Sequence, residues 1–126
     1  MLTYETGNPH FGGRTFVRLD GNGDVLVEQT HGQQVRTFVG QVDPAACAEI
    51  LAHFTTARER RQGAICPAED PPVPGETVVT VRAVIGPERS ELSFWSNRRW
   101  ADPALARLVS GFERLASAAS GGVVRF

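Results

Sequence analysis

Apolar and polar side chains alternate over several short stretches of the chain, and a period of two predicts β-strands. The first such stretch runs from Thr15 to Leu19 and leads into Asp20-Gly21-Asn22-Gly23-Asp24. Asn-Gly accepts the positive φ angles of a tight hairpin turn, so a returning strand is expected over Val25 to Gln29. His31-Gly32-Gln33 predicts a second turn, and a third strand follows from Val35 to Val42. The three strands should form an antiparallel meander.

A second hairpin is predicted further along the chain. Residues 76–85 are rich in Val and Thr and are apolar on both faces, which is typical of a strand with neighbours on both sides. Gly86-Pro87-Glu88 turns the chain, and the returning strand runs from Arg89 to Trp95. Leu92 and Phe94 share one face of that strand, so Trp95 lies on the opposite face.

Two stretches show helical spacing instead, and each begins at an Asp-Pro pair. Asp accepts a hydrogen bond from an unpaired first-turn N–H, and Pro fits the first helical position. After Asp43-Pro44, one side of the first helix carries Cys47, Ile50, Leu51, Phe54 and Ala57. After Asp102-Pro103, the apolar stripe of the second helix is Leu105, Leu108, Val109, Phe112, Leu115, Ala116 and Ala119. Arginines and Gly63 end the first helix, and Gly121-Gly122 ends the second.

These elements predict one α+β domain over residues 1–126. The order is β-β-β-α-β-β-α, with a further short strand proposed for Val123 to Phe126. Each amphipathic helix can cover a sheet, which gives a two-layer sandwich: an antiparallel sheet of five or six strands with two helices on one face. The proline-rich loop over residues 63–76 is interpreted as a crossover within this domain, because the segments on either side are too small to hold a core alone.

Charge and composition narrow the classes of partner. The formal net charge is −1, so no global field attracts nucleic acid or an anionic membrane. No apolar run is long enough to span a bilayer, and the first residues lack the pattern of a signal peptide, so a cytoplasmic location is expected. The chain contains Arg but no Lys, which together with abundant Ala, Gly, Pro and Val fits a GC-rich bacterial genome.

Few residues are candidates for catalysis or metal binding. Cys47 lies on the apolar side of the first helix, where a free buried thiol is usual, and Cys66 lies in the proline-rich loop. Neither these cysteines nor His10, His31 and His53 have the spacing of metal ligands. No cofactor is predicted, and a non-catalytic role is favoured.

One acidic segment and one glycine-rich segment invite ligand interpretations. Asp20 to Asp24 begins like a calcium loop, but Val25 and His31 stand where that loop needs glycine and glutamate. A hairpin turn is the better interpretation. Residues 1–13 are glycine-rich and are expected to be irregular. Their Gly7–Arg14 segment could cradle an anion, and with the proline-rich loop it defines the alternative function, a small-molecule-binding or enzymatic domain.

The segment from Trp95 to Trp100 is the best candidate for a contact surface. Both tryptophans and the pair Arg98 and Arg99 fall within six positions, and Trp and Arg are the side chains that most often anchor interfaces. Three interpretations stand. Trp100 packs over the second helix and the arginines are solvated; or Trp95 on an open sheet face binds a protein; or the tryptophans stack on nucleic-acid bases, the weakest option at this net charge.

Size, element order and the pattern LDGNGDVLVEQ…FVGQVDPAACAEIL resemble the small stand-alone α+β immunity proteins of bacterial toxin systems. The resemblance covers the first half of the chain and carries over no functional residue. It implies a non-catalytic protein-binding module that occludes a toxin partner. The predicted partner-binding residues are Trp95, Arg98, Arg99 and Trp100; self-association through the open sheet face is a further alternative.

Overall fold

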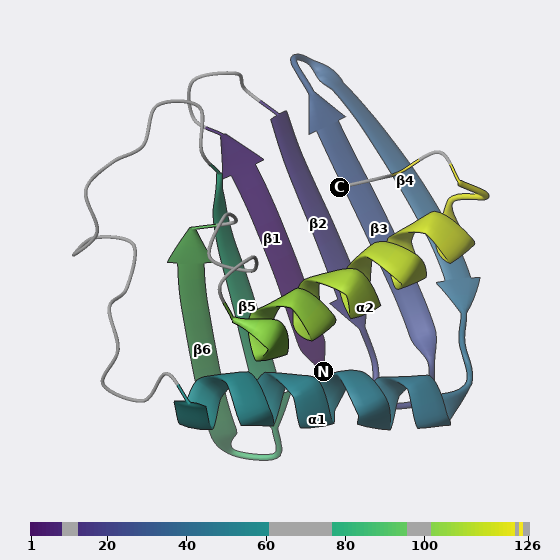
Figure 1. Cartoon of the computed structure of the whole chain (residues 1–126). Coiled ribbons are helices and arrows are strands. Elements are labelled where there is room, and N and C mark those ends of the chain that lie inside the picture. Colours follow the sequence, from purple (N-terminus) through teal and green to yellow (C-terminus); the bar gives the residue numbers. More distant parts are fainter. Residues whose placement is uncertain (9–12, 61–76, 96–101, 123, 125–126) are drawn as a thin grey trace.

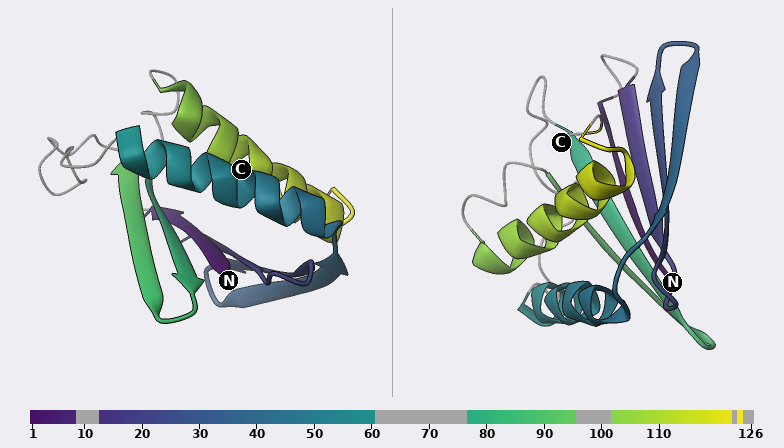
Figure 2. Two further views of the ribbon diagram at one scale, coloured as in Figure 1. Left: turned by 90° about the horizontal axis from the view of Figure 1, so that it is seen from below. Right: turned by 90° about the vertical axis from the view of Figure 1, so that its right-hand side faces the viewer.

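A six-stranded antiparallel sheet carries two helices on one of its faces (Figures 1 and 2). The computed structural model of the chain describes residues 1–8, 13–60, 77–95, 102–122 and 124. Its elements are β1 (Leu2–Asn8), β2 (Gly13–Leu19), β3 (Asp24–His31), β4 (Gln34–Gln41), α1 (Pro44–Arg60), β5 (Val78–Ile85), β6 (Glu88–Trp95) and α2 (Pro103–Ala119). The strand order across the sheet is β4-β3-β2-β1-β5-β6. This architecture confirms the predicted α+β class.

The sixth strand is β1 at the N-terminus, so the prediction that residues 1–13 are irregular is wrong for Leu2–Asn8. β1 pairs with β2 on one side and with β5 on the other, which places it inside the sheet. Leu2 and Tyr4 are buried beneath the helices, whereas Glu5 lies at an alternate position on the opposite face. Gly7 and Asn8 belong to β1 themselves and pair with Arg14 and Gly13 of β2, so their residue types do not make the segment irregular.

The turn between β2 and β3 is held by its own polar groups. The backbone N–H of Gly23 donates to the carbonyl oxygen of Asp20 at 3.0 Å, and the Asn22 side chain bonds both the backbone N–H and the carboxylate of Asp24. Gly23 has φ +97°, and a Cβ at this position would collide with the carbonyl oxygen of Val42. The predicted hairpin turn is therefore confirmed, and it depends on glycine at one position.

Both helices begin at the predicted Asp-Pro pairs. The Asp43 carboxylate accepts a hydrogen bond from the Ala45 N–H at 2.9 Å, and the Asp102 carboxylate accepts one from the Ala104 N–H at 3.0 Å. Each bond satisfies one of the backbone donors that a helix leaves unpaired in its first turn.

The helices pack closely on each other and on the sheet. A Cβ on Gly111 of α2 would stand 3.1 Å from Cγ1 of Ile50 in α1, so the small residue allows the two helices to approach. Deeper in the core, the rings of Tyr4 from β1 and Phe112 from α2 lie with their centroids 5.0 Å apart. Such aromatic pairs add to the stabilisation from burial alone.

The core lies between the sheet and the two helices. It draws alternate residues from the strands and the predicted apolar stripes of both helices, apart from Leu51 and Ala119, which are only partly buried against it. The most completely buried large side chains are Tyr4, Phe94, Phe112, Leu19, Leu105, Leu108, Val17, Val27, Val79, Val81, Val109 and Val124. β1, β2, β3, β5 and β6 each contribute alternate residues to this core, and β4 contributes only the partly buried Phe38. The other set of alternate residues on each strand faces away from the helices.

Two predicted segments fall partly or wholly outside the described residues. The proline-rich loop over residues 63–76 is one of them. Of the terminal strand proposed for Val123 to Phe126, only Val124 is described. It is buried outside any strand, and its N–H donates to the Ser120 hydroxyl at 2.9 Å.

Candidate functional site

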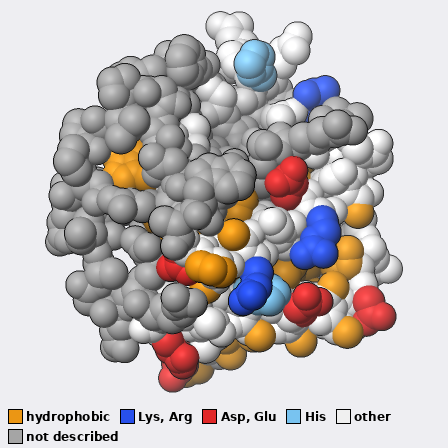
Figure 3. All heavy atoms as spheres, viewed as in Figure 1, with side chains coloured by type: hydrophobic (Ala, Val, Ile, Leu, Met, Phe, Trp, Pro, Cys, Tyr) orange, Lys and Arg blue, Asp and Glu red, His pale blue; other side chains and the backbone are white. Residues whose placement is uncertain are grey.

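The sheet face turned away from α1 and α2, called here the open face, is covered by no helix or strand in the described part of the chain (Figure 2). The strand registers assign to it alternate residues of all six strands. Figure 3 shows the opposite side of the molecule, the helix side, where acidic, basic and apolar side chains are interspersed over the described surface. The side chains of the open face do not pack against the helices, so the core does not account for them.

A line of paired charges crosses the middle of the open face. The Nε of Arg14 in β2 donates to Glu5 in β1 at 2.9 Å, and Glu5 also lies 3.8 Å from Arg82 in β5. The Nε of Arg82 in turn donates to Glu91 in β6 at 2.9 Å. These four side chains are well exposed, so each pair contributes little to stability. Two arginines and two glutamates cancel in charge, so the centre of the face is polar. Both of these arginines are paired with a carboxylate.

Exposed apolar side chains gather at the β4 end of the open face. Val35 is 60% exposed and Val39 is 74% exposed, and Leu26 on β3 pairs with Val39 across the ladder. Next to them on β2, Phe16 lies under the guanidinium of Arg14, whose carbon is 5.4 Å from the ring centroid. Sequence reasoning missed this patch because no faces were assigned to the third predicted strand. The turn at His31 to Gln34 would have placed Val35, Thr37 and Val39 on one side.

A shallow hollow of about 600 Å³ opens beside this apolar patch. Its wall is formed by Arg18, Asp20, Asp24, Val25, Leu26, Val39, Gly40 and Gln41. The Asp24 carboxylate accepts hydrogen bonds from the side chains of Gln41 at 2.8 Å and Asn22 at 2.9 Å, and these bonds lower its pKa. Both carboxylate oxygens of Asp24 therefore accept hydrogen bonds from protein side chains. Asp24 is the last residue of the segment that begins like a calcium loop.

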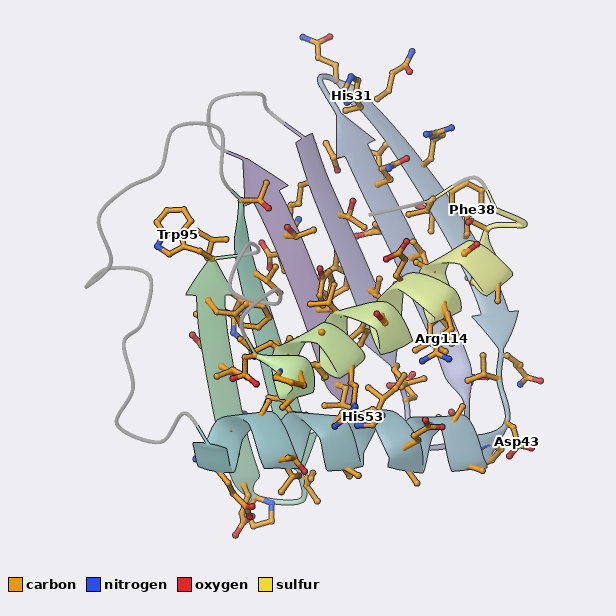
Figure 4. The ribbon with its side chains drawn as sticks, viewed as in Figure 1. His31, Phe38, Asp43, His53, Trp95 and Arg114 are labelled. Atoms are coloured by element: carbon orange, nitrogen blue, oxygen red, sulfur yellow. The ribbon has the colours of Figure 1, made fainter. Side chains whose placement is uncertain are left out.

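Trp95 lies where its alternation predicted. Its backbone pairs with Val78 at the end of β6, and its neighbour Phe94 is buried on the helix side, so the alternation of the strand assigns Trp95 to the open face. Figure 4 labels Trp95 at this end of β6. The side chain is half-buried, and its indole Nε1 is shielded from solvent with no hydrogen-bond acceptor among the described residues. A buried donor without an acceptor is uncommon in folded proteins.

The structure does not bring Trp95 together with the β4 patch. The two lie at opposite edges of the sheet, in the same transverse row of residues, because Trp95 pairs with Val78 and Val35 pairs with Thr30. Five strand spacings separate them, about 24 Å. The other predicted contact residues, Arg98, Arg99 and Trp100, lie outside the described residues.

The described nucleophilic and titratable side chains sit in ordinary structural environments. Cys47 is buried, its thiol lies 3.6 Å from the Asp20 carbonyl oxygen, and burial raises its pKa. His53 lies 3.6 Å from Glu49 one helical turn away (Figure 4). Over the described ranges no three His, Cys, Asp or Glu side chains are grouped so as to hold a metal ion. Cys66 and His10 lie outside those ranges.

The glycine-rich segment proposed as an anion cradle is anchored at both ends by sheet pairing. Gly7 pairs with Arg14, and Asn8 pairs with Gly13, so these residues continue the β1–β2 ladder. Arg14, the proposed clamp, is engaged by Glu5 and stacked on Phe16. A second hollow, of about 210 Å³, lies between α1 and the sheet and is mostly apolar, with Cys47 in its wall.

Comparison with known proteins finds no protein-family model that matches the chain, and no curated protein matches it either. Neither of the two described helices is long and apolar enough to cross a bilayer. The open face must therefore be interpreted from its geometry.

Proposed function

We propose that this chain is a non-catalytic protein-binding module that presents the open face of its sheet to a partner protein. One observation carries the proposal. A six-stranded sheet leaves one face without a covering element in the described chain, and that face holds exposed apolar side chains beside paired charges. Apolar anchors surrounded by polar groups are the usual composition of a protein–protein contact surface.

The dimensions of the face suit such a contact. Strands of seven or eight residues are about 25 Å long, and six strands span about 24 Å, which gives about 600 Å². A specific interface buries about 800 Å² on each partner. A partner that covered the sheet and also touched a bordering segment would reach that size. Arg98, Arg99 and Trp100 lie within five positions of Trp95 in the sequence, which is why they remain in the proposed site.

The placement of the described reactive groups favours binding over catalysis. Cys47 is buried with a raised pKa, which disfavours the reactive thiolate. Arg14 and Arg82 are paired with carboxylates and are not free to hold an anionic substrate. The most concrete form of the proposal is an immunity protein that binds a toxin and occludes its active surface, as the sequence resemblance implies.

Quantitative affinity capture from the native host tests the proposal. The tagged chain should recover one stoichiometric protein, and Trp95→Ala or Arg99→Ala should reduce its recovery about tenfold or more, as expected for anchor residues. Arg58→Ala is the matched control, because Arg58 is exposed on α1 on the helix side, and it should leave recovery unchanged. Equal recovery by all variants would contradict the assignment of the open face.

A stability measurement keeps that experiment interpretable. Trp95→Phe keeps an aromatic side chain, smaller than the indole, and removes the indole donor, which has no acceptor among the described residues. No hydrogen bond within that part of the chain is lost, so Trp95→Phe should unfold within about 1 kcal/mol of the wild type. Reduced capture by a variant that remains this stable reports on the interface and not on the fold.

The immunity form has its own test. If the captured protein is toxic to cells, coexpression of the wild-type chain should restore growth, and coexpression of Trp95→Ala should restore less. Capture of a partner that has no toxic activity would support a protein-binding module but would contradict the immunity role.

A further inference from the structure

Within the described residues, the β4 edge of the sheet lacks the features that usually protect an edge strand. β4 runs for eight residues, Gln34–Gln41, without a proline, and pairs residue for residue with β3 without a bulge. On the open face it shows the uncharged side chains Val35, Thr37 and Val39. Natural sheets commonly guard such edges with charges, prolines or bulges, because unpaired backbone groups recruit other strands.

The opposite edge of the same sheet is guarded. β6 places Arg89 and Glu91 at the corresponding open-face positions, and both are exposed. The one charged side chain of β4 is Arg36, which lies on the helix side and donates to Gln29 at 2.6 Å. β6 thus carries charged side chains at its open-face positions and β4 does not, which indicates that β4 is the edge available for pairing with a further strand.

The backbone groups that β4 presents at this edge can be identified. The Val42 N–H donates to the Gly23 carbonyl oxygen at 2.8 Å, which fixes one hydrogen-bonded pair between the two segments. Hydrogen-bonded and non-bonded pairs alternate along an antiparallel ladder. Counting back in steps of two, Phe38 and Arg36 also turn their backbone groups towards β3. The N–H and C=O groups of Val35, Thr37 and Val39 therefore point outward from the sheet.

We propose that β4 pairs antiparallel with β4 of a second copy of this chain, about a two-fold axis at Thr37. The two six-stranded sheets then join into one continuous sheet whose helices all lie on the same side. The inference goes beyond the proposed function, because it concerns the edge of the sheet. It covers Val35 and Val39 at that edge and leaves the rest of each open face, including the end that carries Trp95, accessible.

The occupant is a second copy because the strand is complementary to itself in this register. Thr37 opposes Thr37 of the second copy, and Val35 opposes Val39 of the second copy. All of them are residues whose backbone groups point outward, so each pair can exchange two hydrogen bonds. The exposed valines, 60% and 74% accessible in one chain, then cover each other.

The helix side of the same register is also complementary. Arg36 comes to stand beside Phe38 of the second copy, and Phe38 lies on the helix side of β4 near the end of α2 (Figure 4). A guanidinium next to an aromatic ring is attracted to its face. A shift of the register by one step in either direction would oppose Val35 either to Thr37 or to Gln41, and would lose the pairing of apolar residues.

Sedimentation equilibrium of the full chain over a wide concentration range tests the proposal. The wild type should pass from 13.7 kDa towards twice that mass as its concentration rises. Thr37→Lys places two like charges on the axis, and Thr37→Pro removes an outward N–H while leaving the β3 ladder intact. Both variants should weaken self-association at least tenfold. Thr56→Lys on the exposed surface of α1 is the matched control and should have no effect.

Two results would overturn the proposal. One is a wild type that remains monomeric up to millimolar concentration. The other is a dimer whose association constant is the same in folded Thr37→Lys as in the wild type. Circular dichroism establishes that each variant is folded. If this edge binds a strand of a different protein instead, the purified wild type should remain monomeric, which is the first of these results.

A cross-link then tests the register. Cα atoms of a hydrogen-bonded antiparallel pair lie about 5.5 Å apart, within the range that a disulfide can bridge. In a Cys66→Ser background, Thr37→Cys should form an intermolecular disulfide under mild oxidation, whereas Thr56→Cys should not. Equal cross-linking of the two variants would contradict a two-fold axis at Thr37.

Discussion

Gly23 shows how much of this fold depends on single residues. Its φ of +97° lies outside the conformations that side-chain-bearing residues adopt readily, and a Cβ there would collide with the Val42 carbonyl oxygen. Gly23→Ala should therefore lower the free energy of unfolding by about 2–4 kcal/mol. Gly21→Ala in the same turn meets no atom within 4 Å and should change stability by less than about 0.5 kcal/mol. Urea unfolding of the two variants checks this, and equal effects would show that the turn does not constrain Gly23.

Cys47 couples the stability of the protein to alkaline pH. Burial raises the pKa of its thiol in the folded chain, so the folded state disfavours the thiolate. The stabilisation is complete below the pKa of the unfolded thiol, about 8.5, and is lost as the pH rises through the higher folded value. The free energy of unfolding of the wild type should therefore fall more between pH 7 and pH 10 than that of Cys47→Ala. Parallel pH profiles for the two proteins would contradict this, and because both retain Cys66 its contribution cancels.

Alternation of side chains predicted the environment of individual residues well. It placed Phe94 in the core and Trp95 on the other face, and both placements are confirmed. On α2, Arg107 and Arg114 are exposed, outside the apolar stripe that helical spacing predicted. What alternation could not reveal is which charged residues meet. The contact between Glu5 and Arg82 joins residues far apart in the chain and follows only from the pairing of β1 with β5.

The helices were the most predictable elements, because their starts are marked by local chemistry. The Asp102 carboxylate caps α2 by accepting the Ala104 N–H. Asp102→Ala should lower the free energy of unfolding by about 1 kcal/mol, while Asp102→Asn, which keeps an acceptor, should lower it by less. Thermal or urea unfolding of both variants measures the difference. A loss from Asp102→Asn as large as that from Asp102→Ala would mean that the charge, and not the cap, stabilises the helix.

The N-terminal strand was the element that sequence reasoning missed. The glycine content of residues 1–13 predicted an irregular segment, although Leu2, Tyr4 and Thr6 alternate with other residues as in a strand. Long-range pairing decides the matter: β1 fills the gap between the first meander and the second hairpin, with Leu2 opposite both Leu19 and Ala83. No local pattern specifies a partner so distant in the chain. The expected sixth strand was accordingly assigned to the wrong terminus.

At the scale of the whole molecule, the sheet gives each of its two faces a different role. One face is buried by the helices and accounts for the apolar pattern of the sequence. The other presents paired charges in the middle, exposed valines at one edge and Trp95 near the other. The fold class and the face of Trp95 could be predicted from the sequence. Alternation could have placed Val35, Thr37 and Val39 on one side of their strand, but that β4 is an edge follows only from the strand order.

Site-specific photo-cross-linking tests most directly whether the open face binds a partner. A benzophenone side chain is placed in the full chain at Glu91, exposed on the open face of β6, or at Glu59, exposed on α1. We expect the Glu91 derivative, irradiated in the native host, to form an adduct with another protein, and the Glu59 derivative to form none. Adducts of twice the chain mass identify a second copy and are counted separately. Adducts with another protein from Glu59 alone would show that the helix side is the binding surface and would contradict the proposed function.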